Sequence, residues 1–296
     1  MDLRQIRCFV AVAEELHFHN AARRLGVAQP ALSRTIKTLE TELGTILFER
    51  SNRKVVLTQA GQTMLEGSNK ILHLSERLVE NVRAAGAGKK GTLRLGYTDN
   101  AINGALPKLL KQFQSDFPDI ELQLHHLVTS RQFASLEDES IDLGFATASQ
   151  VPPGFESLRL QREHFVCLVP EDHRFASLQR IKLKDLRGEP MVRGIASEWA
   201  HFHAHLRPAF LRAGFEPTIA QESLTTSSIL RLVSCGMGIA ILTETTSETP
   251  IPGVKRLEID DMDVQLSTLA IWKAASLPTA KSSFVGFLQR KIASEG

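Results

Sequence analysis

Five side chains between residues 29 and 37 have the types and spacing needed to read a DNA duplex. Small and polar residues come first and cations follow, in the order Gln29, Pro30, Ser33, Arg34 and Lys37. Proline is tolerated in the first turn of a helix, because that N–H has no intrahelical partner. This order suits a helix whose N-terminal end meets base edges and phosphates in the major groove. It is equally the order of a solvated basic helix face.

Two short amphipathic helices position these side chains. The second helix carries a predicted buried stripe of Leu32, Ile36, Leu39 and Leu43 and ends before Gly44. The first carries three apolar residues, Ala21, Ala22 and Leu25, on one face. The connection contains Gly26 and is short, as in a helix-turn-helix. An ordinary helical hairpin has the same pattern, so the pattern alone leaves both interpretations open.

The residues after Gly44 favour the DNA interpretation. Two apolar runs flank residues 51–53 and predict a β-hairpin. A basic hairpin directly after a recognition helix is a wing, and we expect Arg50, Arg53 and Lys54 to contact the DNA backbone or minor groove. An apolar helix expected over 3–16 completes the core of this head.

The charge is unevenly distributed along the 296 residues. Residues 1–90 hold 14 Lys and Arg against 9 Asp and Glu, whereas the remainder holds 21 against 24. A basic head on a slightly acidic body is typical of a DNA-binding protein. The excess is small, so we expect two heads to act together.

The run A-A-R-R-L-G-V-A-Q-P-A-L-S-R-T-I-K-T-L-E-T-E-L-G-T-I-L-F-E-R, followed by L-T-Q-A-G-Q, resembles the N-terminal domain of LysR-type transcriptional regulators. The match is dense there and looser in the rest of the chain. The resemblance implies a winged helix-turn-helix at 1–58, a linker helix and hinge at 59–90, and an effector-binding domain at 91–296. That domain would resemble a periplasmic binding protein, with one subdomain at 92–161 plus 268–296 and the other at 162–267.

A long helix without proline is expected from Thr58 to about residue 85. Its apolar stripe includes Met64, Leu65, Ile71, Leu72, Leu74, Leu78, Val79 and Val82. Such a stripe either packs on its own domain or pairs with a second helix. We favour a second copy of the chain, as the family resemblance implies, and so expect a homodimer or homotetramer.

Strand and helix patterns alternate beyond Gly91. The order strand, helix, strand, helix, strand over 92–146 predicts a parallel sheet with helices on both faces. The alternation restarts after Leu183, and the predicted fold class is therefore α/β. No dinucleotide or phosphate-loop motif and no G-x-S-x-G occurs, so we expect no enzyme activity and no cofactor.

Ligands of open parallel sheets bind beyond the C-terminal strand ends, beside helix N-termini. Hydroxyl-rich stretches at these ends supply the candidates for effector binding: Thr98, Asp99, Thr129, Ser130 and Ser197, with Arg193 and Thr226 as weaker additions. These stretches are 97–100, 128–131, 193–199 and 223–226, and the family resemblance implies effector contacts at the first three. Each residue is also a common helix cap. Such a crevice suits a small organic acid, although Asp99 fits an anion only if it points away or the effector carries a donor.

Cysteine and histidine give weaker signals. Cys8 and Cys235 lie in apolar helical patterns and are expected to be buried, and no C-x-x-C spacing exists. His201, His203 and His205 lack a third ligand at a metal-site spacing, so no metal site is expected.

Two hypotheses therefore compete. The first is a LysR-type regulator that binds a two-fold symmetric operator, with RNA polymerase as a further candidate partner. The second is a solute-binding or solute-metabolising α/β protein with a structural head. The sequence shows no signal peptide and no apolar run long enough for a membrane span. This predicts a cytoplasmic protein and argues against a transport role.

Overall fold

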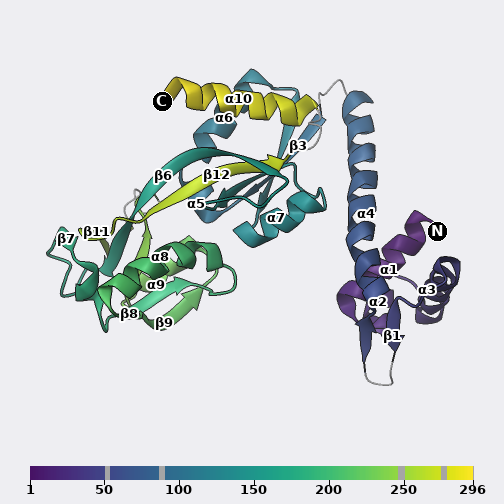
Figure 1. The fold of residues 1–296 in the computed structure, drawn as a ribbon, viewed down its shortest axis with the longest axis horizontal. Coiled ribbons are helices and arrows are strands. Elements are labelled where there is room, and N and C mark those ends of the chain that lie inside the picture. Colours follow the sequence, from purple (N-terminus) through teal and green to yellow (C-terminus); the bar gives the residue numbers. More distant parts are fainter. Residues whose placement is uncertain (51–53, 87–90, 246–250, 275–278, 296) are drawn as a thin grey trace. The chain divides into compact units, whose positions relative to one another are not determined.

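The computed structural model describes residues 1–50, 54–86, 91–245, 251–274 and 279–295. Arg53 therefore lies outside the described residues, and so does the side chain of Arg50. The chain divides into two compact units, which are described separately. The first is built on helices α1 to α4 and the hairpin β1–β2, and the second on the strands and helices from β3 onward (Figure 1).

Three helices and a hairpin form the head of the first unit. These elements are α1 (Leu3–Glu15), α2 (Phe18–Leu25), α3 (Gln29–Leu43), β1 (Phe48–Arg50) and β2 (Val55–Leu57). Gly26 joins α2 to α3 with φ of 65°, a left-handed conformation that suits glycine. Phe9, Leu32, Ile36 and Leu39 meet in its core. Leu43 was predicted to extend this stripe and does not, since it ends α3 and is 40% exposed.

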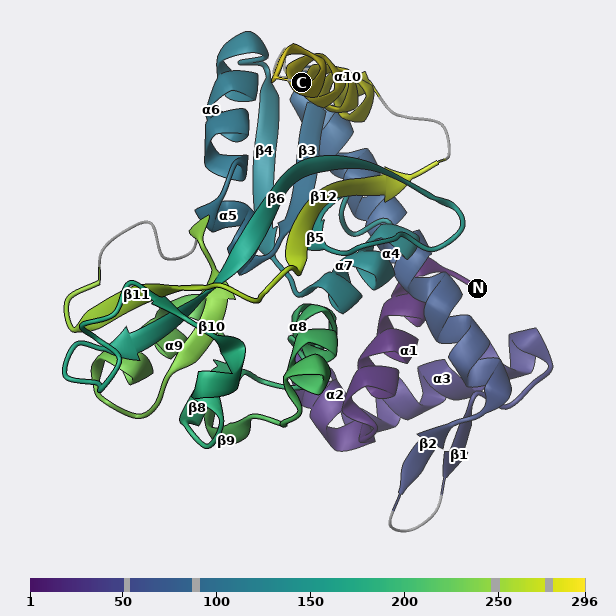
Figure 2. The same ribbon diagram turned by 60° about the vertical axis from the view of Figure 1, so that its left-hand side comes forward.

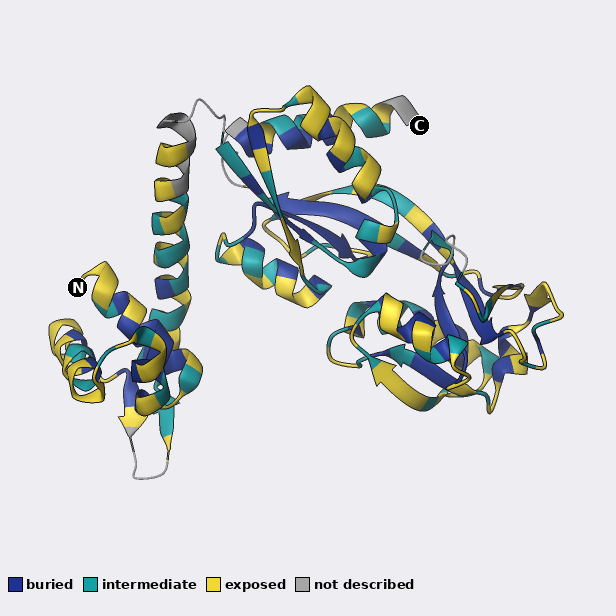
Figure 3. Cartoon of the chain, turned by 180° about the vertical axis from the view of Figure 1, so that it is seen from behind, coloured by how far each residue is buried: buried dark blue, intermediate teal, exposed yellow. Residues whose placement is uncertain are grey.

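Helix α4 (Gln59–Gly86) agrees with the expected long helix. Its first turns pack on the head, where Gly61 lies so close to the Leu47 carbonyl that a side chain would collide with it. Further along, Leu74, Leu78 and Val82 are 60%, 64% and 63% exposed. Figure 3 shows exposed positions along this long helix. This part of the apolar stripe is left uncovered by the single chain, so pairing with a second copy stays a prediction.

The second unit contains two lobes, each with its own hydrophobic core. In lobe one, β3 (Gly91–Tyr97) pairs in parallel with both β4 and β5, as the alternation predicted. The other elements of lobe one are β4 (Ile120–His126), β5 (Leu143–Thr147), α5 (Asp99–Asn103), α6 (Leu106–Asp116), α7 (Thr129–Glu137) and α10 (Thr279–Glu295). Helices α6 and α10 share one core with the sheet and α7 another, so helices cover both faces of the sheet (Figure 2).

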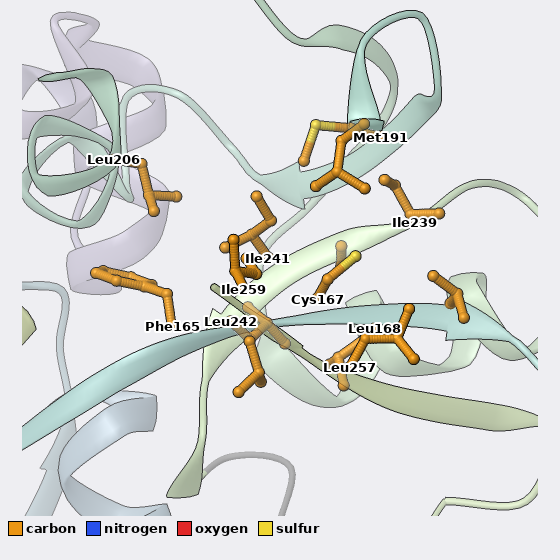
Figure 4. Close-up of a cluster of buried hydrophobic side chains, with 14 of the residues drawn as sticks. Phe165, Cys167, Leu168, Met191, Leu206, Ile239, Ile241, Leu242, Leu257 and Ile259 are labelled. Carbon is orange, nitrogen blue, oxygen red and sulfur yellow. The ribbon is translucent and has the colours of Figure 1, made fainter. Parts of the chain in front are cut away.

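Lobe two contains strands that pair both parallel and antiparallel, in two sheets. Its elements are β7 (Arg180–Ile181), the 3-10 helix η1 (Leu183–Leu186), β8 (Pro190–Gly194), α8 (Ala200–Ala213), β9 (Thr218–Ser223), α9 (Thr226–Ser234), β10 (Ala240–Thr243) and β11 (Val254–Ile259). Phe165, Cys167, Met191, Ile241 and Leu257 meet in its core (Figure 4). Strand β11 was not predicted, because charged residues interrupt its apolar alternation.

Two long antiparallel strands connect the lobes. These are β6 (Phe155–Pro170) and β12 (Gln265–Lys273), which pair over most of the length of β12 (Figure 1). The first half of β6 belongs to the sheet of lobe one, and its second half pairs with β10 and β11 of lobe two. The subdomain boundaries that the family resemblance implies fall within these two strands. The residue boundaries of the domains stay a proposal.

Candidate functional site

The exposed face of α3 presents the side chains predicted to meet DNA. Gln29 and Pro30 are its first two residues, and its N-cap, Ala28, has no side-chain hydrogen bond to the helix. Gln29, Pro30, Arg34 and Lys37 are exposed and Ser33 is half-buried. Within the described residues, neither the side chain of Arg34 nor that of Lys37 has a hydrogen-bonding or ion-pair partner. A helix start without a side-chain cap, followed by two cations whose side chains have no partner, suits a polyanion.

Another arginine of the head is held by acids. Nη1 of Arg24 lies 2.6 Å from Glu14 and 3.5 Å from Glu15, and these contacts raise the pKa of Arg24. Its charge is therefore already compensated within the protein. Among basic residues of α2 and α3, Arg34 and Lys37 are thus better placed than Arg24 to contact phosphates.

Glu40 fixes the wing relative to α3. Its carboxylate accepts hydrogen bonds from the backbone N–H groups of Leu47 and Phe48, at 2.9 and 3.2 Å. Thr58 closes the other end of the hairpin, because its N–H donates to the Leu47 carbonyl. The register pairs Arg50 with Val55 and leaves Lys54 exposed just before β2. The wing therefore starts at a fixed place beside the helix that it would assist.

A cavity of about 550 Å³ lies between the two lobes of the second unit. Lobe one contributes the ends of its strands and the starts of α5 and α7, and lobe two contributes the loop before α8 and the loop before α9. Leu127, Ile195, Trp199, Phe202 and Leu224 provide apolar walls. The polar lining residues are Thr98, Asp99, Asn100, His126, Thr129, Arg131, Thr147, Ser197, Glu198 and His201. We call this cavity the cleft.

Two predicted hydroxyls of the cleft also support its walls. Thr98 caps α5 by accepting the N–H of Ala101. Thr129 is buried and its hydroxyl makes two bonds to the backbone of Thr147, donating to the carbonyl at 3.3 Å and accepting the N–H at 3.1 Å. Both residues therefore have a structural role at the wall, and an effector would meet hydroxyls of fixed orientation.

Asp99 is bound within the chain on both of its oxygens. Oδ2 accepts the backbone N–H of Thr226 at 2.6 Å, and Oδ1 lies 2.7 Å from Nε2 of His126. The carboxylate thus points at the start of α9. Asp99 is therefore compatible with an anionic effector, because its carboxylate is turned toward His126 and the Thr226 N–H.

The start of α8 opens on the cleft. Its N-cap, Trp199, makes no side-chain hydrogen bond to the helix, so the N–H groups of the first turn lack a side-chain acceptor. The indole N–H of Trp199 instead donates to the Leu224 carbonyl at 2.9 Å, and the ring packs on Phe202. Gly194 makes room for this ring, because a side chain there would collide with it. Trp199 therefore joins the two loops of lobe two that line the cleft.

Charges at the cleft are paired across it. Nη2 of Arg131 in lobe one lies 3.7 Å from Oε1 of Glu198 in lobe two. His201 also lines the cleft, and burial lowers its pKa, with a smaller effect of nearby His205 in the same direction. A neutral His201 can offer a hydrogen bond without adding a charge.

Three predicted effector residues do not line the cleft. Ser130 is exposed on α7, and Thr226 is buried with its backbone N–H on Asp99. Arg193 lines a separate hollow of about 870 Å³ in lobe two, where its guanidinium bonds Glu222 at 2.8 and 2.9 Å. Ser197 lies at the cleft with Thr98, Asp99 and Thr129, so the structure brings four of the seven predicted residues together there.

Sequence reasoning missed several residues of the cleft. Arg131 and Trp199 lie inside stretches that the sequence singled out, but neither was selected, because hydroxyls were taken as the signal. His126 ends β4 and could have been found by the same strand-end argument. Nothing in the local sequence of Phe202 or Leu224 distinguishes them from ordinary core residues.

The remaining histidines and cysteines have structural surroundings. Nε2 of His203 bonds the Gly194 carbonyl at 2.9 Å, and burial lowers the pKa of this imidazole. In the part of the chain that the structure describes, no group of three or more potential ligands could hold a metal ion. Cys8 and Cys167 are buried, but Cys235 is exposed, contrary to prediction, because it lies at the end of α9.

Comparison with known proteins agrees with both parts of the structure. Residues 3–62 match the bacterial regulatory helix-turn-helix domain of the lysR family, and residues 86–293 match the LysR substrate binding domain. The chain belongs to the LysR family of transcriptional regulators. The HTH-type transcriptional regulator XapR of Escherichia coli (strain K12) is 34% identical over 256 residues, which are 86% of each chain.

Solved structures of LysR regulators share this fold. CbnR, a LysR family transcriptional regulator, is 29% identical and superposes with a TM-score of 0.78, over 98% of this chain and 99% of its own. CbnR has also been solved in complex with its target DNA. BenM of Acinetobacter baylyi is 30% identical over 265 residues, covering 89% of this chain and 87% of BenM. The relatives are named as regulators, in agreement with the prediction that the chain is not an enzyme.

The comparisons confirm the fold class and the family, and they favour a LysR-type regulator over the second hypothesis. This LysR regulator combines a helix-turn-helix with an α/β effector-binding domain. None of the described helices is both long and apolar enough to cross a membrane.

Proposed function

We propose that this regulator senses a small organic acid, bound in the cleft between the lobes. The observation that carries the proposal is the start of α8, which faces the cleft without a side-chain cap. Backbone N–H groups of a first helical turn and the helix dipole together favour an anion. Ser197 lies just before this turn and can add a hydroxyl donor.

The walls of the cleft fit the rest of such a molecule. Trp199 and Phe202 supply aromatic surface beside the helix start, and Leu127 supplies aliphatic surface from lobe one. Thr98 and Thr129 hold hydroxyls at the opposite wall. BenM, a relative of this chain, has been solved with its effector benzoate, an aromatic acid. Benzoate is therefore a suitable first probe, although the natural effector is a matter for screening.

The acid would act on an oligomer in which two helix-turn-helix heads bind DNA together. The uncovered stripe of α4 supports a homodimer or homotetramer, and two heads would bind a two-fold symmetric operator. CbnR provides an example of a relative solved with its target DNA. We infer that Gln29, Pro30, Ser33, Arg34 and Lys37 read the major groove and that Arg50, Arg53 and Lys54 contact the backbone or the minor groove. RNA polymerase is a further candidate partner.

A matched pair of probes tests the acid proposal. The thermal midpoint of the full chain is measured with benzoate and with benzamide, which has the same shape without the charge, and the panel is then extended to other aromatic and aliphatic acids and their amides. Ligands that bind the folded state raise the midpoint. We expect at least one acid to stabilise the protein and its amide to have little effect. The Ser197→Ala variant should respond less to that acid.

Two results would count against the proposal. One is stabilisation by an amide or an amine with no stabilisation by any acid of the panel. The other is an acid response that Ser197→Ala and a Trp199 variant leave unchanged, because it would place the acid outside the cleft.

A further inference from the structure

Asp99 connects the two lobes through a buried helix terminus. It lies at the start of α5 in lobe one, and its Oδ2 accepts the backbone N–H of Thr226 at the start of α9 in lobe two, at 2.6 Å. Its side chain is only 16% exposed. A charged acceptor on a backbone N–H makes a stronger bond than a neutral one. This bond therefore ties the lobes at the inner end of the cleft.

The start of α9 is capped from two directions. Thr225 accepts the N–H of Ser228, as an ordinary N-cap does, and Asp99 supplies the second acceptor from the other lobe. The carboxylate lies where the helix dipole favours a negative charge. Thr226 itself is 2% exposed, and its hydroxyl has no hydrogen-bond partner among the described residues. The carboxylate of Asp99 thus occupies a position that could otherwise hold the carboxylate of a ligand.

The neighbouring residue makes a second bond between the lobes. Nδ2 of Asn100 donates to Oγ1 of Thr243 at 3.0 Å, and both residues are buried. Two consecutive residues of α5 therefore each reach into lobe two. On the other side of Asp99, His126 is partly exposed and keeps the second carboxylate oxygen in lobe one. The carboxylate is fixed from both lobes.

We propose that Asp99 is a built-in anion that takes the place of a ligand at the start of α9. It is a positioning residue, which holds the lobes together before any effector binds. Because its carboxylate occupies the start of α9, an effector carboxylate is directed to the start of α8 instead. The last statement rests on the proposed acid effector, whereas the first two do not.

Removing the carboxylate and supplying a free one tests this proposal. Trp199 is a buried tryptophan of the cleft, and Trp272→Phe leaves it as the only one in the chain. In that background, Asp99→Gly should lower the thermal midpoint and increase the quenching of Trp199 by acrylamide. Formate at constant ionic strength should reverse both changes with saturation, and chloride should not.

Asp142→Gly is the matched control. Asp142 is also a buried aspartate, and its Oδ2 accepts the Arg94 backbone N–H at 2.9 Å, but both residues lie in lobe one. Its loss should lower the midpoint and leave Trp199 quenching unchanged. Asp99→Asn, which keeps the shape and an acceptor oxygen, should give an intermediate effect and provides a second variant if the glycine variant does not fold.

The proposal is overturned if Asp99→Gly and Asp99→Asn leave Trp199 quenching at the wild-type value. It is also overturned if formate protects wild type and Asp142→Gly as much as Asp99→Gly. The proposed acid effector fails in a different way, through the absence of any acid response in the wild type. The formate experiment separates the two, because it needs no effector.

Discussion

The exposed face of α3, which we propose to read DNA, and the cleft differ in how their charged side chains are paired. On α3, Arg34 and Lys37 are exposed, and among the described residues their side chains have no partner. In the cleft, Asp99 is bound by His126 and the Thr226 N–H, and Arg131 faces Glu198. The cations of the first surface are thus available to pair with a polyanion. In the cleft, these charged side chains already have partners inside the protein, whereas the start of α8 has no side-chain cap.

This difference predicts different consequences of mutation. Removing a free cation from α3 takes away a contact that exists only in the DNA complex, so DNA affinity should fall while stability stays the same. Removing a paired group from the cleft leaves its partner without its bond inside the protein, which costs stability first. The predictions below test this contrast, from the largest expected effect to the smallest.

Arg34→Ala should have the largest effect. Each lost contact with a base or a phosphate weakens binding by about 1–3 kcal/mol, and a two-headed complex loses two such contacts. We expect a loss of affinity of at least about tenfold, measured by fluorescence anisotropy on a bound duplex, without change in the thermal midpoint.

Arg24→Ala is the control for Arg34, because Arg24 is already held by Glu14 and Glu15. Its effect on affinity should be several times smaller. Equal losses for the two variants would show that general charge, and not the free face of α3, governs binding.

Trp199→Phe should have an intermediate effect on the cleft. It removes the bond from the indole N–H to the Leu224 carbonyl and should lower the free energy of unfolding by about 1 kcal/mol. It should also weaken the response to a stabilising acid, because it loosens two loops that line the cleft.

Trp272→Phe is the matched comparison. It removes a similar bond, from the indole N–H to Glu156 at 2.8 Å, but within lobe one. Urea unfolding should show a similar loss for both variants, with the acid response reduced in Trp199→Phe alone. A reduced acid response in both variants would mean that the response depends on global stability and not on the cleft.

Acidification should lower the folding stability of the second unit, because His203 becomes protonated. Burial lowers the pKa of His203 below its ordinary value of 6.5, with a smaller effect of Arg193 in the same direction and an opposing effect of the Gly194 carbonyl. The folded state then binds fewer protons than the unfolded state below that value. Stability should be complete above about pH 6.5 and should fall as the pH drops through the folded pKa.

His203→Gln should flatten this dependence in urea titrations between about pH 5 and pH 8. His201, whose pKa burial also lowers, should account for part of what is left. An unchanged pH profile in His203→Gln would contradict the assignment.

Cys235→Ser should have the smallest effect of these variants: it should change thiol labelling and leave the stability of the protein unchanged. Cys235 is exposed, whereas burial raises the pKa of Cys167 to about 12, with a smaller effect of Glu189, and also raises the pKa of Cys8. Thiolate is the reactive form. A disulfide reagent should label one thiol per native chain, and Cys235→Ser should abolish this labelling.

The contrast also explains which features the sequence could predict. Local periodicity predicts which side of α3 is exposed, whereas the pattern alone left open whether that side binds DNA. The predicted burial of Leu43 was wrong, because the apolar periodicity of a helix does not show where the surface packed against it ends. The predicted burial of Cys235 was wrong, because this residue lies at the end of a helix. The cleft depends on contacts such as Asp99 with Thr226, which are 127 residues apart in sequence. Local patterns found the strand ends but not the partners.

Selection of genomic DNA fragments by the full chain tests the central claim most directly. Fragments retained by the wild type are sequenced and compared with those retained by Arg34→Ala and by Arg24→Ala. We predict that the wild type and Arg24→Ala enrich the same two-fold symmetric motif and that Arg34→Ala does not. Enrichment of that motif by Arg34→Ala as strong as by the wild type would contradict the assignment of α3 as the recognition helix.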